Sequence, residues 1–412
     1  MNVQVADLQR PPRLKFIDMA RSLAILLMLE GHFTGAALSQ DYRKLEYFPY
    51  AIWYNVHGLT SPLFFTVTGL VFVYLLTANN TIPYFGNSRI KKGYKRVGML
   101  LFWGYFIQLS FNSLFRDLFH GFKNVFNGDG WVFTFHFDWL QAFHVLQSIG
   151  VGIFFLLVIY GVYKMINIGG VYWYYLIGAI AIFSIHGLMK LHIEWDARLI
   201  EAGTLAADQK RYLPSGAPAF IQNMFYGKFS DFSWVRYAGY TVFGGMLGSL
   251  IRKFEHQTKE WWFSLIFIVT GVLIAAYIQP FFHHIDAMLR GMGLKGTWEL
   301  NSTHFVRIGE VITLLGILMV IDARFDIKAK LFLKVGQNTL AIYIIHVIIL
   351  YGGIFGFGLK PLAFNENLGP WAAVAISATA ITFFVIMVNY IEPLEVFYSK
   401  AKNKLLFRKD HD

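Results

Sequence analysis

Long apolar stretches follow one another along most of this 412-residue chain and decide what it can fold into. A helix of about 20 apolar residues crosses the hydrocarbon core of a bilayer, and inside that core the backbone must satisfy its own hydrogen bonds. Hydrophobic residues make up 56% of the chain and charged residues 15%, which is too apolar for a soluble protein of this length. We therefore predict an all-α, polytopic integral membrane protein that forms a single domain over residues 1–412. About ten spans are expected, near residues 16–36, 58–78, 97–115, 140–163, 170–189, 235–251, 261–280, 304–322, 331–353 and 370–391.

Basic residues mark one side of the expected topology. Clusters of Lys and Arg fall in short segments between alternate apolar runs, whereas the longer segments on the other side are aromatic and mixed in charge. Positively charged segments stay in the cytoplasm, so both termini are expected there. The same pattern accounts for the net charge of +11 and argues against a nucleic-acid partner. The longest outer segment, near 190–234, is a candidate lid for recognising a substrate, with a plain structural cap as the alternative.

Several kinds of chemistry are excluded or unsupported. The chain has no cysteine, which rules out disulfides, thiolate metal sites and cysteine nucleophiles. The segment from Met1 to Pro12 is polar, and the first apolar run is too long and too charged for a cleavable signal peptide. That run is expected to act as its own targeting signal. No P-loop, GxGxxG or HExxH motif occurs, so nucleotide hydrolysis and zinc proteolysis lack support, and no metal is expected.

The first apolar run contains four ionisable side chains: Asp18, Arg21, Glu30 and His32. Each costs free energy inside a membrane unless it is paired or used. Arg21 and His32 are eleven residues apart, close to three helical turns, so both project from one face about 16 Å apart along the axis. We interpret this face as the wall of a pocket, with Asp18 and Arg21 toward the cytoplasm and Glu30 and His32 toward the outside. Asp18 could equally just pair with Arg21.

Histidines from several spans are expected at one depth, in the outer half of the membrane. Any one of them could be a polar residue satisfied against a neighbouring helix. The convergence of several titratable groups is costly, however, and is the usual mark of a site. Arg307 and Glu310 could form a buried pair that holds helices in register, or could orient a catalytic histidine. The histidines in question are His32, His57, His144, His304 and His346.

The start of the second span and the basic segment after it are further candidates. Gly58 and Gly69 favour close helix packing, whereas His57 is a candidate site residue. Pro62 is expected to loosen the first turn of this helix. The basic segment serves either as topogenic charge attracted to anionic lipid or as a seat for a phosphate-bearing ligand such as a coenzyme A nucleotide. Such a seat would use Arg89, Lys92 and Arg96, with Arg21 continuing it inward.

The arginine, ten residues and histidine of the first span, Arg21 to His32, resemble the signature of membrane-bound acyltransferases of the acyltransferase-3 type. The segment Gly58-Leu-Thr-x-Pro-Leu-Phe also resembles the bacterial relatives of heparan-alpha-glucosaminide N-acetyltransferase. Two later blocks, residues 145–150 and 335–346, are similar to further parts of the same superfamily. The resemblance covers most of the ten-helix core.

Two positions depart from the family pattern. The heparan-type enzymes have their active histidine where this chain has Trp53, so His32 and His57 compete for that role. Gly98 stands roughly where a proline usually closes the basic segment. These departures make the subfamily a less specific match than the superfamily.

The resemblance implies an integral membrane enzyme that takes an acyl group, usually acetyl, from cytoplasmic acyl-CoA and delivers it to a sugar on the far side. Acetyl-CoA would be the co-substrate, and an extracytoplasmic glycan or glycolipid the acceptor. The bacterial cytoplasmic (inner) membrane is the expected location. The candidate catalytic residues are His32, His57, Arg307, Glu310 and His346; Arg21, Arg89, Lys92 and Arg96 would bind the donor; and His144, His304 and Asp18 are the candidate substrate-binding residues.

The mechanism and two rival functions can be stated from these residues. His32 would deprotonate an acceptor hydroxyl or amine, or accept the acyl group itself before passing it on. Arg307, or a histidine partner, would stabilise the tetrahedral oxyanion. A proton-coupled transporter or flippase would use the same histidines as a proton relay. A non-catalytic sensor or scaffold would need none of them. The acceptor, the acyl chain and the oligomeric state are not written in the sequence.

Overall fold

The computed structural model describes residues 14–127, 142–201, 232–325 and 328–407, together with residues 218, 221, 224 and 225. Within these residues every regular element is a helix, and the one β contact is an isolated bridge between Leu38 and Leu368. The predicted all-α class is therefore confirmed.

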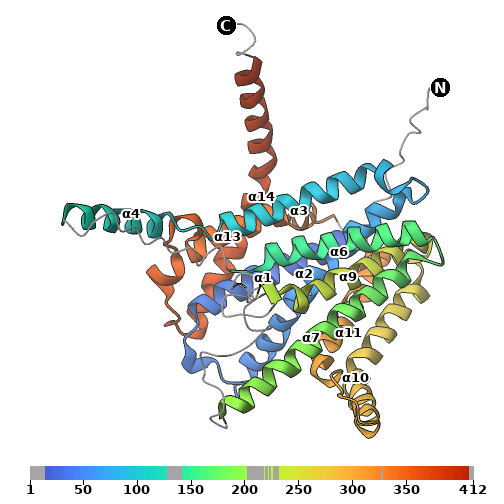
Figure 1. Cartoon of the computed structure of the whole chain (residues 1–412). Helices are drawn as coiled ribbons and strands as arrows, with labels where there is room; N and C mark the ends of the chain where they lie inside the picture. Colours follow the sequence, from blue (N-terminus) through green and yellow to red (C-terminus); the bar gives the residue numbers. More distant parts are fainter. Residues whose placement is uncertain are drawn as a thin grey trace. The chain divides into compact units, whose positions relative to one another are not determined.

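The longer described helices are labelled along the chain in Figure 1. They are α1 (Lys15–Ala37), α2 (Phe48–Leu76), α3 (Ser88–Phe106), α4 (Phe111–Phe126), α6 (Val145–Ile166), α7 (Val171–Glu201), α9 (Trp234–Lys253), α10 (Trp261–Gly291), α11 (Ser302–Arg324), α12 (Lys330–Gln337), α13 (Thr339–Tyr351) and α14 (Pro370–Phe407).

Six of the described helices are long and apolar enough to cross a membrane: α2, α6, α7, α10, α11 and α14. Two bent pairs, α3 with α4 (52°) and α12 with α13 (78°), raise this number to eight if each pair forms one span. The other two predicted spans correspond to the continuous helices α1 and α9, and the apolar sequence of α1 contains the ionisable residues Asp18, Arg21 and Glu30. These helices indicate an integral membrane protein. The number of ten spans and the cytoplasmic location of both termini stay predictions.

The chain divides into two compact units. The larger unit comprises residues 1–17 and 62–325, and the smaller unit comprises residues 18–61 and 326–412. Both α1 and α2 contribute residues to both units. In α2 the division falls at Pro62, which lies inside an otherwise continuous helix.

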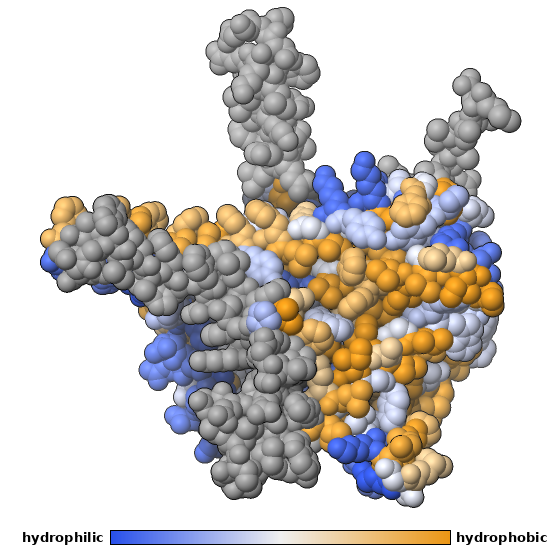
Figure 2. Space-filling view, in the orientation of Figure 1, coloured by the Kyte–Doolittle hydropathy of each residue, from blue (hydrophilic) through white to orange (hydrophobic). Residues whose placement is uncertain are grey.

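Close helix packing forms the core of the larger unit. Helix α6 packs on α3 and α9, α7 packs along α9, and α10 packs along α11. At Gly69 of α2, a Cβ atom would lie 1.8 Å from the Thr241 carbonyl oxygen of α9. The packing role predicted for Gly69 is thus confirmed, because a side chain there would separate the two helices. Figure 2 shows apolar residues over much of the visible surface, as expected for helices that face lipid.

Several helices extend beyond the predicted spans, which corrects three sequence-based assignments. Helix α2 begins at Phe48, because Pro49 in its first turn breaks no helical hydrogen bond. His57 is therefore well inside the helix, and Pro62 is not in its first turn as predicted. Helix α7 continues to Glu201, because residues 190–201 are rich in helix formers. The start of the proposed lid near 190–234 is thus helical, and most of the remainder lies outside the described residues.

Candidate active site

The α1 helix presents the Arg21 and His32 side chains on one face. It runs without a break from Lys15 to Ala37, so the eleven-residue separation corresponds to about three turns and about 16 Å along the axis. Arg21 Nη1 lies 3.8 Å from Asp18 Oδ1, which confirms the ion pair considered as one reading of Asp18. The cation and the imidazole thus lie on one wall of the smaller unit, with the acidic partner beside the cation.

The His32 imidazole contacts two residues of α13. His32 Nδ1 lies 2.7 Å from the Tyr351 hydroxyl oxygen, within hydrogen-bond distance. The ring of Tyr351 meets it edge-on, with centroids 5.7 Å apart, and the ring of His346 lies at 5.1 Å. His32 is only partly buried, whereas His346 behind it is completely buried. Of the five histidines expected at one depth, His32 and His346 thus lie in contact with each other.

The protonation of His346 follows from its neighbour. Its Nδ1 lies 3.3 Å from the carbonyl oxygen of Ile342. Because a carbonyl only accepts, Nδ1 carries the proton and Nε2 carries the lone pair. Nε2 is buried and has no hydrogen-bond partner among the described residues. Buried polar atoms are nearly always satisfied, so this atom is a candidate contact for a substrate or a water molecule.

The break between α12 and α13 sets the direction of α13. Gly336 of α12 lies against α1, where a Cβ atom would be 2.6 Å from the Asp18 carbonyl oxygen. The Ser22 hydroxyl donates to the Phe332 carbonyl and accepts from the Gly336 N–H at 2.9 Å. Asn338 follows α12, and α13 leaves at 78°. The block 335–346, singled out from the sequence, therefore holds α12 on α1 and directs His346 toward His32.

His57 occupies a place on α1 that only glycine leaves open. A Cβ atom at Gly31 would lie 2.0 Å from His57 Nδ1. The other face of the imidazole stacks on Trp53, with centroids 5.0 Å apart and planes within 4° of parallel. His57 Nδ1 is buried without a hydrogen-bond partner among the described residues. The structure thus places His57 directly beside the residue that precedes His32.

Glu30 holds this arrangement together. Its Oε1 accepts hydrogen bonds from Trp53 Nε1 at 2.7 Å and from the Thr34 hydroxyl at 2.8 Å. Thr34 Oγ1 in turn lies 2.7 Å from Ser377 Oγ of α14. The carboxylate therefore fixes Trp53, and Trp53 fixes the plane of His57. Hydrogen bonds to a charged acceptor are stronger than neutral ones, so the Glu30 carboxylate holds the Trp53 indole firmly in place.

A second histidine cluster lies in the larger unit. His304 Nδ1 is 2.8 Å from the Tyr240 hydroxyl oxygen, and its ring meets His186 edge-on at 4.6 Å. His186 Nδ1 lies 2.7 Å from Asn301 Oδ1. The pairing of His304 with His186 was not anticipated, because no pattern along the chain places residue 186 opposite the start of α11. This cluster belongs to a different unit from His32.

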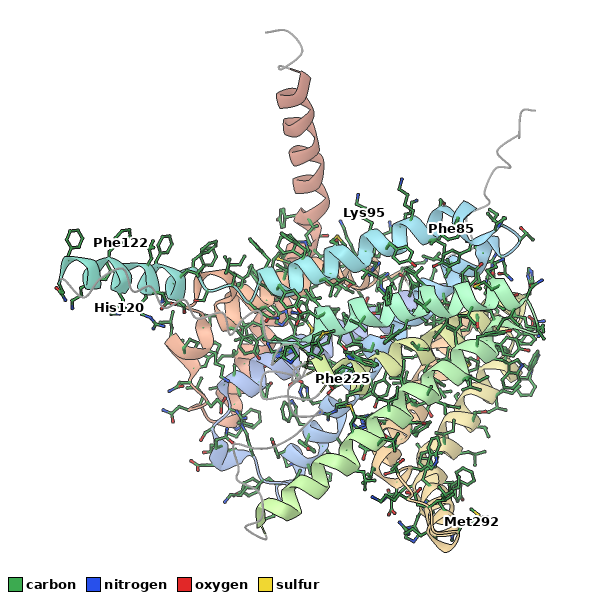
Figure 3. The ribbon with its side chains drawn as sticks, in the orientation of Figure 1. Phe85, Lys95, His120, Phe122, Phe225 and Met292 are labelled. Carbon is green, nitrogen blue, oxygen red and sulfur yellow. The ribbon has the colours of Figure 1, made fainter. Side chains whose placement is uncertain are left out.

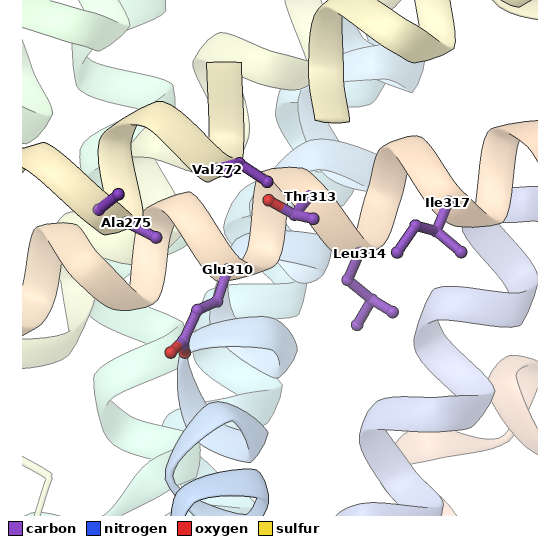
Figure 4. Close-up of a pocket in the computed structure, with 7 residues that line it drawn as sticks. Val272, Ala275, Glu310, Thr313, Leu314 and Ile317 are labelled. Atoms are coloured by element: carbon purple, nitrogen blue, oxygen red, sulfur yellow. The ribbon is translucent and has the colours of Figure 1, made fainter. Parts of the chain in front are cut away.

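Arg307 and Glu310 form the pair that was considered from the sequence. Arg307 Nη1 donates to Glu310 Oε2 at 2.7 Å on α11. Glu310 also lines an open, mainly apolar pocket of about 510 Å³ between α10 and α11, beside Ala275 and Thr313. Figure 4 shows the carboxylate at one end of this pocket and Ile317 at the other. Both residues belong to the larger unit, so their roles in catalysis stay predictions.

The basic segment forms the first half of α3. Asn87 caps the helix, its Oδ1 accepting from the Arg89 N–H at 2.9 Å. Arg89, Lys92 and Arg96 are spaced i, i+3, i+7, so they lie along one side of the helix. Lys91 and Lys95 lie on another side, and Figure 3 shows Lys95 projecting away from the ribbon. One helix thus offers two basic stripes, of which only the first was proposed as a phosphate seat.

Two features of the site could not be read from the sequence. Tyr351 is the last residue of α13, before Gly352 ends the helix with φ 84°, and nothing in the pattern marks its hydroxyl. Trp53 was noted only as a departure from the family pattern. His144, by contrast, precedes α6, and its backbone N–H donates to Gln147 Oε1 at 3.2 Å. Its position at the start of that helix is confirmed, and its role in substrate binding is untested.

Comparison with protein families gives one match. The sequence model of the acyltransferase-3 family, described as an acyltransferase domain, matches residues 14–389. The matched range runs from α1 into α14 and takes in both units. No curated protein matches the chain closely.

Proposed function

The chain belongs to the acyltransferase-3 family, and from this premise we propose that it transfers an acyl group, acetyl in the first instance, from cytoplasmic acyl-CoA to a hydroxyl or amine of an extracytoplasmic glycan. The observation that carries the proposal is the His32 imidazole. It is partly exposed, it is hydrogen-bonded to Tyr351, and it shares a helix face with Arg21. A reactive imidazole held by a second group is the arrangement that general base catalysis requires.

His32 is proposed as the proton-transfer group. With Nδ1–H donating to Tyr351, Nε2 is left free as a base. It takes the proton of the acceptor O–H or N–H while the acceptor atom bonds to the thioester carbonyl carbon. The tetrahedral intermediate then collapses, the C–S bond breaks, and the departing thiolate takes the proton back from the imidazolium. In the acyl-enzyme route, Nε2 of His32 attacks the thioester carbonyl carbon and the CoA thiolate leaves first. The acceptor atom then attacks the acyl-imidazole, the C–N bond breaks, and the freed Nε2 takes the acceptor proton and passes it to the thiolate.

Two orphaned ring atoms suggest where the substrates contact the site. His57 Nδ1 and His346 Nε2 lack partners among the described residues. A bound acceptor, or the oxyanion that forms from the thioester, would supply or accept the missing hydrogen bonds. This assigns the competing histidines to different tasks: His32 moves the proton, while His57 and His346 position the reacting groups.

A histidine substitution tests the proposal directly. We expect His32→Ala to remain folded and to lose transfer of label from radioactive acetyl-CoA to membrane glycan. His284→Ala, at an exposed position on α10, is the matched control and should keep full activity. Wild-type turnover by His32→Ala would eliminate the mechanism. Movement of a glycan across the membrane without any covalent label, in both proteins, would favour the transporter instead.

The donor seat is tested separately, because α3 carries its own control. Lys92→Gln with Arg96→Gln removes charge from the proposed phosphate side, and Lys91→Gln with Lys95→Gln removes the same charge from the other side. Charge-assisted contacts to phosphate are each worth about 1.5–3 kcal/mol. We therefore expect the first variant to raise the KM for acetyl-CoA by more than about tenfold, and the second to change it little. Equal effects of the two variants would show that the charge serves topology alone.

A further inference from the structure

Two basic side chains, Lys190 of α7 and Arg236 of α9, lie beside the second histidine cluster of the larger unit. Lys190 is one helical turn beyond His186, and Arg236 is one turn before Tyr240. Helices α7 and α9 pack along each other (Figure 1). Both cations are close enough to act electrostatically on the His304 imidazole. They therefore belong to one region, although they come from different helices.

Helices α7 and α9 run in opposite directions. A Cβ atom at Gly178 of α7 would lie 3.5 Å from the side chain of Val242 of α9. A Cβ atom at Gly239 would lie 2.7 Å from the ring of Phe183, so residue numbers fall along α9 where they rise along α7. A step forward along α7 and a step back along α9 thus lead to the same end of the unit. This is the end at which α9 begins.

The basic half of α3 lies at the opposite end of the unit. Gly93 in that half packs against Leu157, in the second half of α6, and α7 begins shortly after α6 ends. Lys253, the last residue of α9, lies 5.1 Å from the centroid of the Tyr172 ring, at the start of α7. Membrane proteins collect basic residues on the cytoplasmic side, which accounts for one basic end. That rule gives no reason for cations at the end where α9 begins.

Neither cation has an acidic partner among the described residues. Within the same residues, the Lys190 ammonium donates to the Leu300 carbonyl oxygen alone, at 3.4 Å. The Arg236 guanidinium lies over the Tyr237 ring, with Cζ 5.2 Å from the ring centroid, and makes no hydrogen bond there. Stacking on an aromatic ring holds a guanidinium while its N–H donors stay available for an anion.

The described acidic side chains of α10, η6 (Glu299–Asn301) and the first half of α11 have other partners. Glu310 accepts from Arg307, and Glu299 Oε1 lies 3.2 Å from His283 Nδ1. Asp286 accepts hydrogen bonds from the backbone N–H groups of residues 298 and 299. These carboxylates therefore leave both cations without a counter-charge.

Arg236 also stands against the dipole of its own helix. Helix α9 begins at Trp234, so Arg236 lies in its first turn. The backbone gives this end of a helix a partial positive charge, which disfavours a cation there. Ser233, at the N-cap, makes no side-chain capping hydrogen bond that would offset this charge. The position thus costs stability in the free protein, and a bound anion would remove that cost.

We propose that Lys190 and Arg236 bind a phosphate group at this end of the larger unit. A guanidinium offers paired N–H donors and an ammonium offers a compact charge, and a phosphate has enough oxygen atoms to accept from both at once. A free phosphate ion and the headgroup of a phospholipid carry the same chemistry. The site takes no part in the proposed acyl transfer, so its test does not depend on that activity.

Thermal unfolding of the full-length protein tests the origin of the effect. The protein would be purified in dodecyl maltoside micelles free of phospholipid, and chloride would keep the ionic strength constant as inorganic phosphate is added. We expect phosphate to raise the melting temperature of the wild type and to leave that of the Lys190→Gln, Arg236→Gln double variant unchanged. Without phosphate, Arg236→Gln should melt at the same temperature as the wild type or higher. A lower melting temperature would assign Arg236 to the fold and overturn the proposal.

Titration calorimetry with inorganic phosphate measures the affinity directly. Loss of charge-assisted contacts should weaken binding by the double variant at least about tenfold. Arg290→Gln, which removes an exposed cation near the end of α10, is the control and should bind as the wild type does. Equal phosphate affinity in the wild type and the double variant would refute the assignment.

Native mass spectrometry separates the two sources of phosphate. Phosphatidylglycerol would be added to the micelles, and the lipid retained by the protein would be counted. Lipid retained by the wild type and lost from the double variant would identify a phospholipid headgroup as the ligand. Binding of inorganic phosphate without selective lipid retention would identify the free ion. If neither probe distinguished the wild type from the double variant, the two cations would not form a phosphate site.

Discussion

The hydrogen bond between Tyr351 and His32 can be removed with one atom. Tyr351→Phe deletes the hydroxyl that lies 2.7 Å from His32 Nδ1 and keeps the ring that meets the imidazole edge-on at 5.7 Å. Loss of one hydrogen bond to a partly exposed group costs about 0.5–1.5 kcal/mol. Since about 1.36 kcal/mol corresponds to a factor of ten in rate, kcat should fall about 2- to 13-fold. KM should change little, because the hydroxyl is proposed to hold the tautomer of His32 and not to bind a substrate.

The assay is the initial rate of label transfer from acetyl-CoA in reconstituted membranes. Tyr390→Phe, at an exposed position on α14, is the control for loss of a tyrosine hydroxyl and should behave as wild type. In a His32→Ala background, adding Tyr351→Phe should lower the residual rate no further, because both changes act through one imidazole. A wild-type kcat for Tyr351→Phe, or a full additional loss in the His32→Ala background, would refute this reasoning.

Two further substitutions follow from the smaller unit. Gly31→Ala places a Cβ atom 2.0 Å from His57 Nδ1 and should lower the rate of acyl transfer by displacing that ring. Gly35→Ala is the control, because a Cβ atom there has nothing within 4 Å and should leave the rate unchanged. Equal transfer rates for the two variants would show that His57 does not belong to the site. In the connection between α13 and α14, hydrogen bonds from Lys360 and then Gln40 hold the pKa of Glu366 below its ordinary value of 4.5. A carboxyl with a lowered pKa stabilises the fold above that ordinary value and loses this contribution as the pH falls through the lowered one. Thermal unfolding should therefore show Glu366→Gln less stable than wild type at neutral pH, with the difference vanishing in acid; a difference that persists in acid would assign the effect to packing.

The helical class and the position of the spans follow from the sequence because they depend on local composition. Every predicted span coincides with a helix or a bent pair, and the Arg21 to His32 spacing places both side chains on one face as expected. The start of α2 was misplaced because the polar and aromatic residues from Phe48 onward are helical without being apolar enough to register as a span.

The partners of each site residue could be predicted only in part. Periodicity shows which face of a helix a residue occupies, but the opposite helix depends on tertiary packing. His346 was found because it stands in a recognisable block, whereas Tyr351 depends on where α13 happens to end. His304 meets His186 and Tyr240, a grouping that no spacing along the chain indicates. The amphipathic α4 was missed because its residues had been assigned to a span and a loop on hydropathy alone.

The α1 helix is held at two points. Near its first turns Gly336 and Ser22 join it to α12, and about three turns later His32 meets His346 and Tyr351 of α13. Because these contacts lie about three turns apart, they prevent α1 from sliding or rotating against α12 and α13. The relative placement of the two imidazoles is therefore decided when the chain folds, so under the proposed mechanism His32 would need no reorganisation before it accepts a proton.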